Sequence, residues 1–416
     1  MFQRFLDDGP RRASYLVACP RAREAVVIDP RRDVDVYVDA ARAMGVRIAW
    51  AFETHLRGDN VSGARELLAL GARVIAGPGA GLCYPHHEAA GGERLRVGDL
   101  SILFIHTPGH TAEGLSVLAS QPEQPVRLFT GDLIRSAGVG SPSGEDARAN
   151  ERLAHALHDS LFGKVLVLDE RIRVHPGDPG EAGTIGHQKR TNPMLRHRAR
   201  QDFVAAVLAE VTVAPAYQSR LRRMNRAGPP LLGLASGYRG PAAISPGSAA
   251  AALRARGMMI DLREPLTFDE GHARGAINLR PGPDLGSLAA GLLPPDPRVV
   301  LLASDGRQAA QAARQPVLHV HPFADAEQAG EHAQRQHLIA DERAQAHQEH
   351  GVDVEGAASE RDRSPQEGHQ GGQTQHQHDQ AGHDEQVRRA AQQHVAQVAP
   401  AVADRPQLGV ALARIV

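Results

Sequence analysis

The sequence is poor in cysteine, lysine and long apolar runs. Its 416 residues include two cysteines, Cys19 and Cys83, and two lysines, Lys164 and Lys189. Two thiols are too few for a disulfide framework or a zinc ribbon. The absence of a run of about 18 apolar residues argues against a membrane-spanning helix, and the N-terminus lacks the apolar core of a signal peptide.

The sequence also has little excess charge. Lys plus Arg total 47 against 48 Asp plus Glu, which leaves a formal net charge of -1. This balance offers no electrostatic reason to expect a nucleic-acid or membrane partner. The composition therefore predicts a cytoplasmic protein, and the length predicts two or three domains on a scale of about 100–200 residues each.

The first part of the chain alternates between two kinds of apolar pattern. Buried strands are predicted at 14–18, 25–30 and 47–55, and helices at 34–45 and 62–71. Strands that alternate with helices favour an α/β layered fold.

The composition divides the chain into four segments. We predict a globular domain at 1–225, a Gly/Pro-rich linker at 226–247, a second α/β domain at 248–323, and a His/Gln-rich, low-complexity tail at 324–416. The second domain should include a strand at 317–323. The tail is too polar to offset its ordering entropy and is predicted to be disordered apart from a short helix near 387–399. A genuine tail and a shifted reading frame both remain open as its origin.

Three side chains of metal-ligand type follow predicted strands of the first domain. His55 lies in Thr-His-Leu-Arg-Gly-Asp-Asn, His110 in Thr-Pro-Gly-His-Thr, and Asp132 in Thr-Gly-Asp. Taken singly, each is more typical of a structural hydrogen-bonding or turn residue. Because strand ends meet at one edge of a sheet, the three together indicate a common site.

These motifs resemble those of the metallo-β-lactamase superfamily, in which a T-H-x-H-x-D-H motif precedes P-G-H-T and T-G-D turns. The resemblance covers about residues 1–225 and implies an αββα sandwich with the metal site at one edge of the paired sheets. Three positions depart from the family pattern. Arg57 and Asn60 replace histidines of the first motif, and Asp178 aligns with a late histidine. Since arginine does not serve as a metal ligand, these changes argue against a two-zinc centre.

The remaining ligand set is His55, His110 and Asp132. Two histidines and one carboxylate form the facial triad of non-haem ferrous oxygenases. The branch of the superfamily that uses these positions is the persulfide dioxygenases. The resemblance therefore implies one Fe(II) per chain and oxidation of a glutathione-type persulfide to sulfite with O2. No other cofactor site is predicted.

Further site residues are assigned by position. Asp59 would orient a ligand or a metal-bound water, or else cap the following helix. Arg57 would attract an anionic substrate, or else repel the metal and mark an inactive protein. Lys189 and Arg190 would contact substrate carboxylates, or else form a solvated helix start. Family members often pair, which implies a homodimer.

Residues 258–279 resemble the rhodanese domain, which also handles sulfane sulfur. Asp261, Arg263 and Glu264 match its D-x-R-E motif, and a buried Asp–Arg ion pair is expected. Asp305 stands where the catalytic cysteine would be expected, and no cysteine occurs in residues 84–416. We therefore predict an incomplete, non-catalytic rhodanese-like module.

Two other functions stay open for the whole chain. One is a zinc-dependent thioesterase of the glyoxalase II type, and the other is a degenerate, non-catalytic protein that binds sulfur compounds or a partner. The losses at Arg57, Asn60 and Asp178 count against the thioesterase.

Overall fold

The protein was studied as a computed structural model. The structure describes residues 1–6, 12–231, 243–255, 257–282, 285–293, 298–313 and 409–414. The predicted strand at 317–323 and most of the predicted tail, including the helix near 387–399, lie outside these segments.

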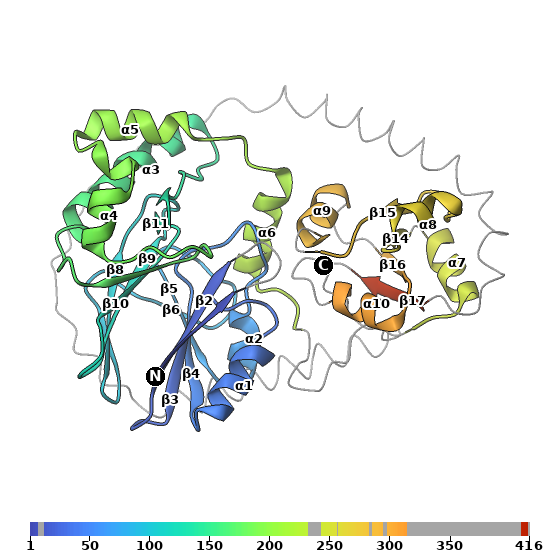
Figure 1. The fold of residues 1–416 in the computed structure, drawn as a ribbon, viewed down its shortest axis with the longest axis horizontal. Coiled ribbons are helices and arrows are strands. Elements are labelled where there is room, and N and C mark those ends of the chain that lie inside the picture. The colour runs from blue at the N-terminus through green and yellow to red at the C-terminus, as the bar shows by residue number, and fades with distance from the viewer. Residues whose placement is uncertain are drawn as a thin grey trace, which may run out of the picture.

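Two β-sheets packed face to face form the first domain (Figure 1). The first sheet has the order β1-β2-β3-β4-β5-β6. Its strands are β1 (Phe2–Leu6), β2 (Ala13–Cys19), β3 (Glu24–Ile28), β4 (Arg47–Phe52), β5 (Arg73–Ala76) and β6 (His87–Glu88). The second sheet has the order β13-β10-β9-β8-β7. Its strands are β13 (Arg173–Pro176), β10 (Arg127–Gly131), β9 (Leu115–Ser120), β8 (Leu100–His106) and β7 (Arg94–Val97). A hairpin of β11 (Ile134–Arg135) and β12 (Gly138–Val139) comes after β10.

Side-chain alternation along the strands creates the layers. In β2, Tyr15 and Val17 belong to the apolar cluster between the sheets, together with Phe104 of β8. Leu16, one residue away, belongs to a second cluster with Tyr37 of the first helix. Because successive side chains of a strand point to opposite faces, β2 is buried on both sides.

Helices cover the outer face of each sheet, as Figure 1 shows. The first sheet packs against α1 (Asp35–Ala43) and α2 (Ala64–Ala69). The second packs against α3 (Ala147–Ser160), η1 (Leu161–Val165), α4 (Ile185–Thr191), η2 (Met194–Arg196) and α5 (Arg200–Ala209). This is the αββα sandwich that the motifs imply.

The second domain is a smaller α/β unit. Its sheet has the order β15-β14-β16-β17, with strands β15 (Ile277–Asn278), β14 (Met258–Asp261), β16 (Arg298–Ala303) and β17 (Gly409–Arg414). Its helices are α7 (Pro246–Arg254), α8 (Pro265–Glu270), α9 (Leu285–Leu292) and α10 (Gly306–Ala313). Apolar clusters lie on both faces of the sheet, which is typical of parallel strands.

Three details differ from the predicted segments. Helix α6 (Ala216–Ala227) continues two residues into the predicted linker, and α7 begins at Pro246, two residues before the predicted second domain. Residues 409–414 of the predicted tail form β17, which pairs antiparallel with β16. The sequence GVALAR is apolar and is followed by Ile415 and Val416, unlike the polar part of the tail before it.

Candidate metal centre

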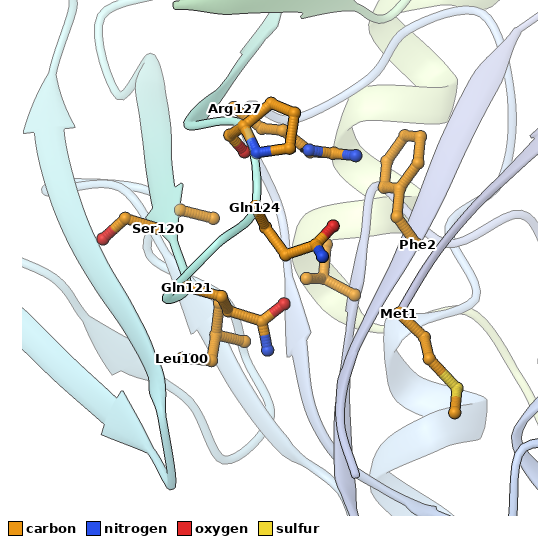
Figure 2. A pocket seen from close by; sticks show the side chains of 10 residues that line it. Met1, Phe2, Leu100, Ser120, Gln121, Gln124 and Arg127 are labelled. Carbon is orange, nitrogen blue, oxygen red and sulfur yellow. Dashed lines mark hydrogen bonds between the residues drawn. The ribbon is translucent and has the colours of Figure 1, made fainter.

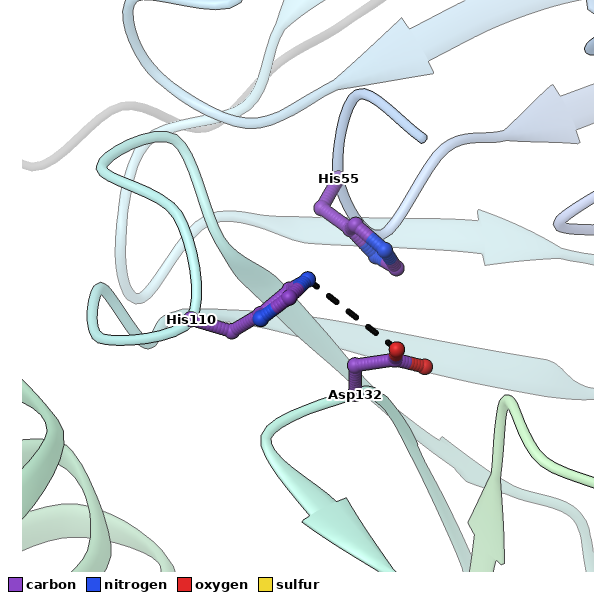
Figure 3. Close-up of side chains that lie close together, drawn as sticks. All are labelled: His55, His110 and Asp132. Atoms are coloured by element: carbon purple, nitrogen blue, oxygen red, sulfur yellow. Dashed lines mark ion pairs between the residues drawn. The ribbon is translucent and has the colours of Figure 1, made fainter. Parts of the chain in front are cut away.

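His55, His110 and Asp132 come together at one edge of the sandwich (Figure 3). His55 follows β4, His110 lies between β8 and β9, and Asp132 directly follows β10. One ligand atom from each residue lies within 4.8 Å of the other two. The Nε2 atom of His110 is 4.0 Å from Oδ2 of Asp132, and the two imidazole rings are nearly perpendicular at 83°.

Hydrogen bonds determine which nitrogen each histidine presents. The Nδ1 atom of His110 lies 2.6 Å from the carbonyl oxygen of Ser141. A carbonyl only accepts, so Nδ1 donates the proton and Nε2 keeps its lone pair. The Nδ1 atom of His55 lies 2.9 Å from Oγ1 of Thr54, whose single hydroxyl proton is directed to the Asp29 carboxylate at 2.8–2.9 Å. Thr54 must therefore accept from His55, which also leaves Nε2 free.

Burial and charge favour the protonation states that metal ligands need. Desolvation lowers the pKa of His55 well below its usual range, so that the ring is neutral. Burial alone would raise the pKa of Asp132, but the charge of Arg12 lowers it below its usual range. Two imidazoles and a carboxylate with converging lone pairs fit a divalent transition metal. His55, His110 and Asp132 would be its ligands.

A glycine makes room for this arrangement beside Asp132. Gly131 has a φ of +52°, in the left-handed region that favours glycine. A Cβ atom on Gly131 would lie 2.3 Å from Oγ1 of Thr54 and 3.2 Å from Nδ1 of His55. The Thr-Gly-Asp turn is therefore required for the approach of β10 to the histidine loop.

Two arginines border the ligand group. The Nη1 atom of Arg12 lies 3.0 Å from both carboxylate oxygens of Asp132, and its Nη2 atom pairs with Asp59. Arg57 is 3% exposed, and its Nη2 atom lies 3.1 Å from Oδ2 of Asp29. Burial would lower the pKa of Arg57, but Asp29 and then Asp59 raise it above its usual range. Both guanidinium groups are therefore charged.

Asp59 contributes its carboxylate to Arg12 and does not cap the next helix. Helix α2 begins at Ala64, and Gly63 precedes it without a side-chain cap. The Oγ atom of Ser62 accepts from the Ala64 N–H at 2.9 Å instead. The capping alternative for Asp59 was wrong because Ser62 lies closer to the free amides of the helix start.

Asn60 and Asp178, which stand where the family has histidines, hold other partners. The backbone oxygen of Asn60 accepts from Nδ2 of Asn225 at 2.9 Å. Asp178 accepts from the backbone N–H and hydroxyl of Ser136. Asn225, on α6, also donates to the backbone oxygen of Arg57 and accepts from the Ser62 N–H. Helix α6 therefore holds the loop that contains His55 and Arg57.

Lys189 and Arg190 lie on α4 (Ile185–Thr191). Lys189 donates to Oε1 of Glu170 at 2.8 Å. The next turn of the chain approaches the site, since Asn192 donates to the backbone oxygen of Gly138 in the β11–β12 hairpin. No contact between either basic side chain and the ligand group is described.

The expected active-site position of the second domain holds a helix cap. Asp305 accepts from the Gln308 N–H at 2.8 Å, and Gln308 in turn accepts from the Ser304 N–H at 2.7 Å. The Asp305 carboxylate therefore caps the start of α10, and the Gln308 side chain binds the residue before the cap. The expected ion pair is confirmed: Arg263 donates to both carboxylate oxygens of Asp261, which is fully buried.

A small pocket lies elsewhere on the first domain (Figure 2). Met1, Phe2, Gln121, Gln124 and Arg127 are among the residues that line it, and none of the three ligands does. The guanidinium of Arg127 stacks on the ring of Phe2. The pocket and the metal-ligand group are separate.

Sequence patterns alone missed four residues of this site. Thr54 and Asp29 are polar residues at the ends of buried strands, and this pattern could have identified them. Arg12 and Asn225 had none, because their contacts with Asp132 and the loop at 57–62 span more than 100 residues of sequence.

The fold and ligand group define a protein of the metallo-β-lactamase class with a second domain behind it. The chain is 31% identical over 214 residues to the hydroxyacylglutathione hydrolase of Nitrosococcus oceani, covering 48% of this chain and 72% of the relative. It is 28% identical over 233 residues to that of Francisella tularensis subsp. tularensis, covering 56% and 81%. Residues 245–332 match the rhodanese-like domain family.

A solved structure shows the same fold. A metallo-β-lactamase from Staphylococcus aureus is 24% identical with a TM-score of 0.62, covering 71% of this chain and 89% of that one. ETHE1 from Myxococcus xanthus is 26% identical with a TM-score of 0.49, covering 55% and 98%. The chain belongs, through its first domain, to the metallo-β-lactamase-fold family that contains the hydroxyacylglutathione hydrolases, and a rhodanese-like domain comes after it. Among the described residues, no helix is both long and apolar enough to cross a membrane.

Proposed function

We propose that the protein is a cytoplasmic persulfide dioxygenase that acts in sulfide metabolism. The observation that carries this proposal is the set of three converging ligands, His55, His110 and Asp132, beside Arg57 and Asn60, which cannot complete a two-zinc centre. Two histidines and a carboxylate are the ligand set of non-haem ferrous oxygenases. Fe(II) bound to these residues would supply the redox chemistry that spin-forbidden O2 requires.

The overall reaction consumes a thiol persulfide, O2 and water, and it releases the thiol and sulfite. Bonds between Thr54 and His55 and between Ser141 and His110 keep both rings oriented with Nε2 toward the centre. Arg57 and Asp59 supply charge next to it. We assign both to the catalytic site, Arg57 as a fixed positive charge and Asp59 as the partner of Arg12.

The substrate is a small thiol persulfide, and Lys189 and Arg190 would bind its carboxylates. Support for this role comes from α4 itself, which is joined to the hairpin next to Asp132 through the Asn192–Gly138 hydrogen bond. Lys189 would exchange its exposed partner Glu170 for a substrate carboxylate. The active form would be a homodimer, without nucleic-acid or membrane partners.

A zinc-dependent thioesterase is the second candidate, because the relatives from Nitrosococcus and Francisella are named hydroxyacylglutathione hydrolases. Such an enzyme needs an activated water molecule, usually supplied at a zinc centre. A third candidate is a non-catalytic protein that binds no metal, because the charges of Arg57 and Arg12 take its place.

A measurement of O2 uptake, together with the metal content of the same sample, distinguishes the three candidate functions. The chain is reconstituted anaerobically with Fe(II), its metal content is measured, and glutathione persulfide is added with O2. We expect one iron per chain and sulfite formation, both lost in Asp132→Ala. Zinc with hydrolysis of a glutathione thioester would establish the second candidate, and absence of bound metal would establish the third.

A further inference from the structure

Two guanidinium groups lie among three carboxylates at the edge of the ligand group. Asp29 pairs with Arg57, while Asp59 and Asp132 both pair with Arg12. With Asp29, Asp59 and Asp132 ionised, these contacting groups sum to one negative charge before a metal binds. A divalent cation reverses that sign, so the loaded site has one positive charge. Without the two arginines the loaded site would stay negative and would repel anions.

The guanidinium of Arg57 is a buried positive charge with little freedom to move. Its side chain is 3% exposed, and Nε and Nη1 have no hydrogen-bond partner among the described residues. The third nitrogen, Nη2, faces Asp29 and lies near the metal carboxylate, because a Cβ atom on Gly177 would be 3.0 Å from Nη2 and 2.7 Å from Oδ1 of Asp132. A buried guanidinium with unused donors next to a ligand is suited to an anion.

Arg12 has a different position. Its side chain is 18% exposed, whereas that of Asp132 is 5% exposed, so Arg12 lies on the solvent side of the ligand group. It donates to both oxygens of Asp132, the same atoms that a metal would use. A metal on Asp132 would weaken this ion pair and leave guanidinium donors of Arg12 available.

We infer that Arg12 and Arg57 form an anion subsite next to the metal, where they supply the positive charge that a second metal ion would otherwise give. The ligand class is a small sulfur anion, such as a persulfide or a sulfur oxyanion, bound by Arg12 from the solvent side. This inference rests on the proposed metal site, and it makes Arg12 a residue that both competes for Asp132 and binds the substrate anion.

The test uses the full chain loaded with Zn²⁺, which removes redox chemistry from the measurement. Zinc affinity is determined by competition with a chelator, and sulfite binding to the zinc-loaded protein by calorimetry. Arg12→Gln is compared with Arg21→Gln, a control that removes the same charge from an arginine whose side chain is 80% exposed. Arg57→Lys, which keeps the charge but loses the planar donors, is the second variant.

We expect opposite changes in Arg12→Gln: zinc binds several-fold more tightly because Asp132 is released, and sulfite binds at least tenfold more weakly. Arg57→Lys should retain zinc and lose sulfite affinity by a smaller factor. A merely structural role for Arg12 would weaken both affinities and would overturn the inference. Equal sulfite binding in Arg12→Gln and Arg21→Gln would overturn it while leaving the metal site intact. If the wild-type chain binds no zinc or iron, the proposed function fails as well.

Discussion

The two domains differ in the residues that come directly after their central strands. In the first domain, β4, β8 and β10 lead into His55, His110 and Asp132, whose ligand atoms converge within 4.8 Å. In the second, β16 leads into Asp305, whose carboxylate caps α10. Both positions are turns at a strand end, where side chains are free to meet a ligand. The comparison shows that the same kind of position serves chemistry in one domain and helix stability in the other.

The difference lies in how the polar groups are satisfied. The Nε2 atoms of both histidines in the first domain keep unused lone pairs, because Thr54 and Ser141 engage only the Nδ1 atoms. In the second domain, Asp305 accepts from the Gln308 N–H, and the Gln308 side chain accepts from the Ser304 N–H. A polar side chain that caps a helix uses its acceptor atoms on backbone N–H groups. A metal-ligand set instead needs lone pairs that no protein donor uses and that point toward one common position.

The largest expected effect comes from exchanging a ligand for alanine. Asp132→Ala should lower metal affinity by more than about 100-fold, since removing an outer hydrogen-bond partner alone costs about 10–100-fold. Metal content after dialysis checks this. Asp305→Ala is the matched control from the second domain and should leave metal content unchanged. Equal losses in both variants would contradict the assignment of the two positions.

A smaller effect is expected when the orientation of a ligand is disturbed. Thr54→Val keeps the side-chain shape but removes the hydroxyl between Asp29 and His55. The Nδ1–H group of His55 then has no acceptor at this position to hold the orientation of the ring. Metal affinity should fall by about 10–100-fold. Thr191→Val, on α4, removes a hydroxyl that donates to His187 and is the control. An unchanged affinity in Thr54→Val would show that the hydroxyl does not orient the ring.

The domains should also differ in how acid affects them. His175 lies on β13 and packs against Phe2, Tyr15 and Phe129. Burial lowers its pKa to about 3. The unfolded chain binds a proton near pH 6.5 that the folded chain does not, so stability should fall as the pH drops from 6.5 toward 3.

The slope from this one group is about 1.4 kcal/mol per pH unit, and His175→Phe should remove it. Fluorescence of Trp50, the single tryptophan, reports unfolding of the first domain alone. His272→Gln in the second domain should leave that fluorescence transition unchanged. A parallel pH dependence in wild type and His175→Phe would mean that other groups dominate acid unfolding.

The smallest effect concerns the cap of the second domain. Asp305→Ala should destabilise α10 by about 1 kcal/mol, the usual loss for an N-cap. Hydrogen exchange of the amides at 306–309 measures this directly. Asp305→Asn keeps an acceptor and should retain most of the protection. Unaltered exchange in Asp305→Ala would show that this helix cap contributes little.

Much of the fold was predictable from local pattern. Apolar runs located β2, β3 and β4, and helical spacing located α1 and α2, because burial favours these patterns whatever the fold. The motifs then supplied the sandwich and the three ligands. Pattern failed at β17, a short apolar segment near the end of a polar tail, and at the end of α6, which runs two residues past the predicted boundary.

The sequence by itself determined which chemistry the chain contains: imidazole and carboxylate ligands after strands, arginine in place of a ligand histidine, and no thiol in the second domain. Only the tertiary structure decided which charges meet. Arg12 and Asp132 are 120 residues apart, and Arg57 and Asp29 are 28 apart. Their pairing results from how two sheets and their connecting loops pack at one edge, because electrostatic contacts depend on distance in space and not on separation in sequence.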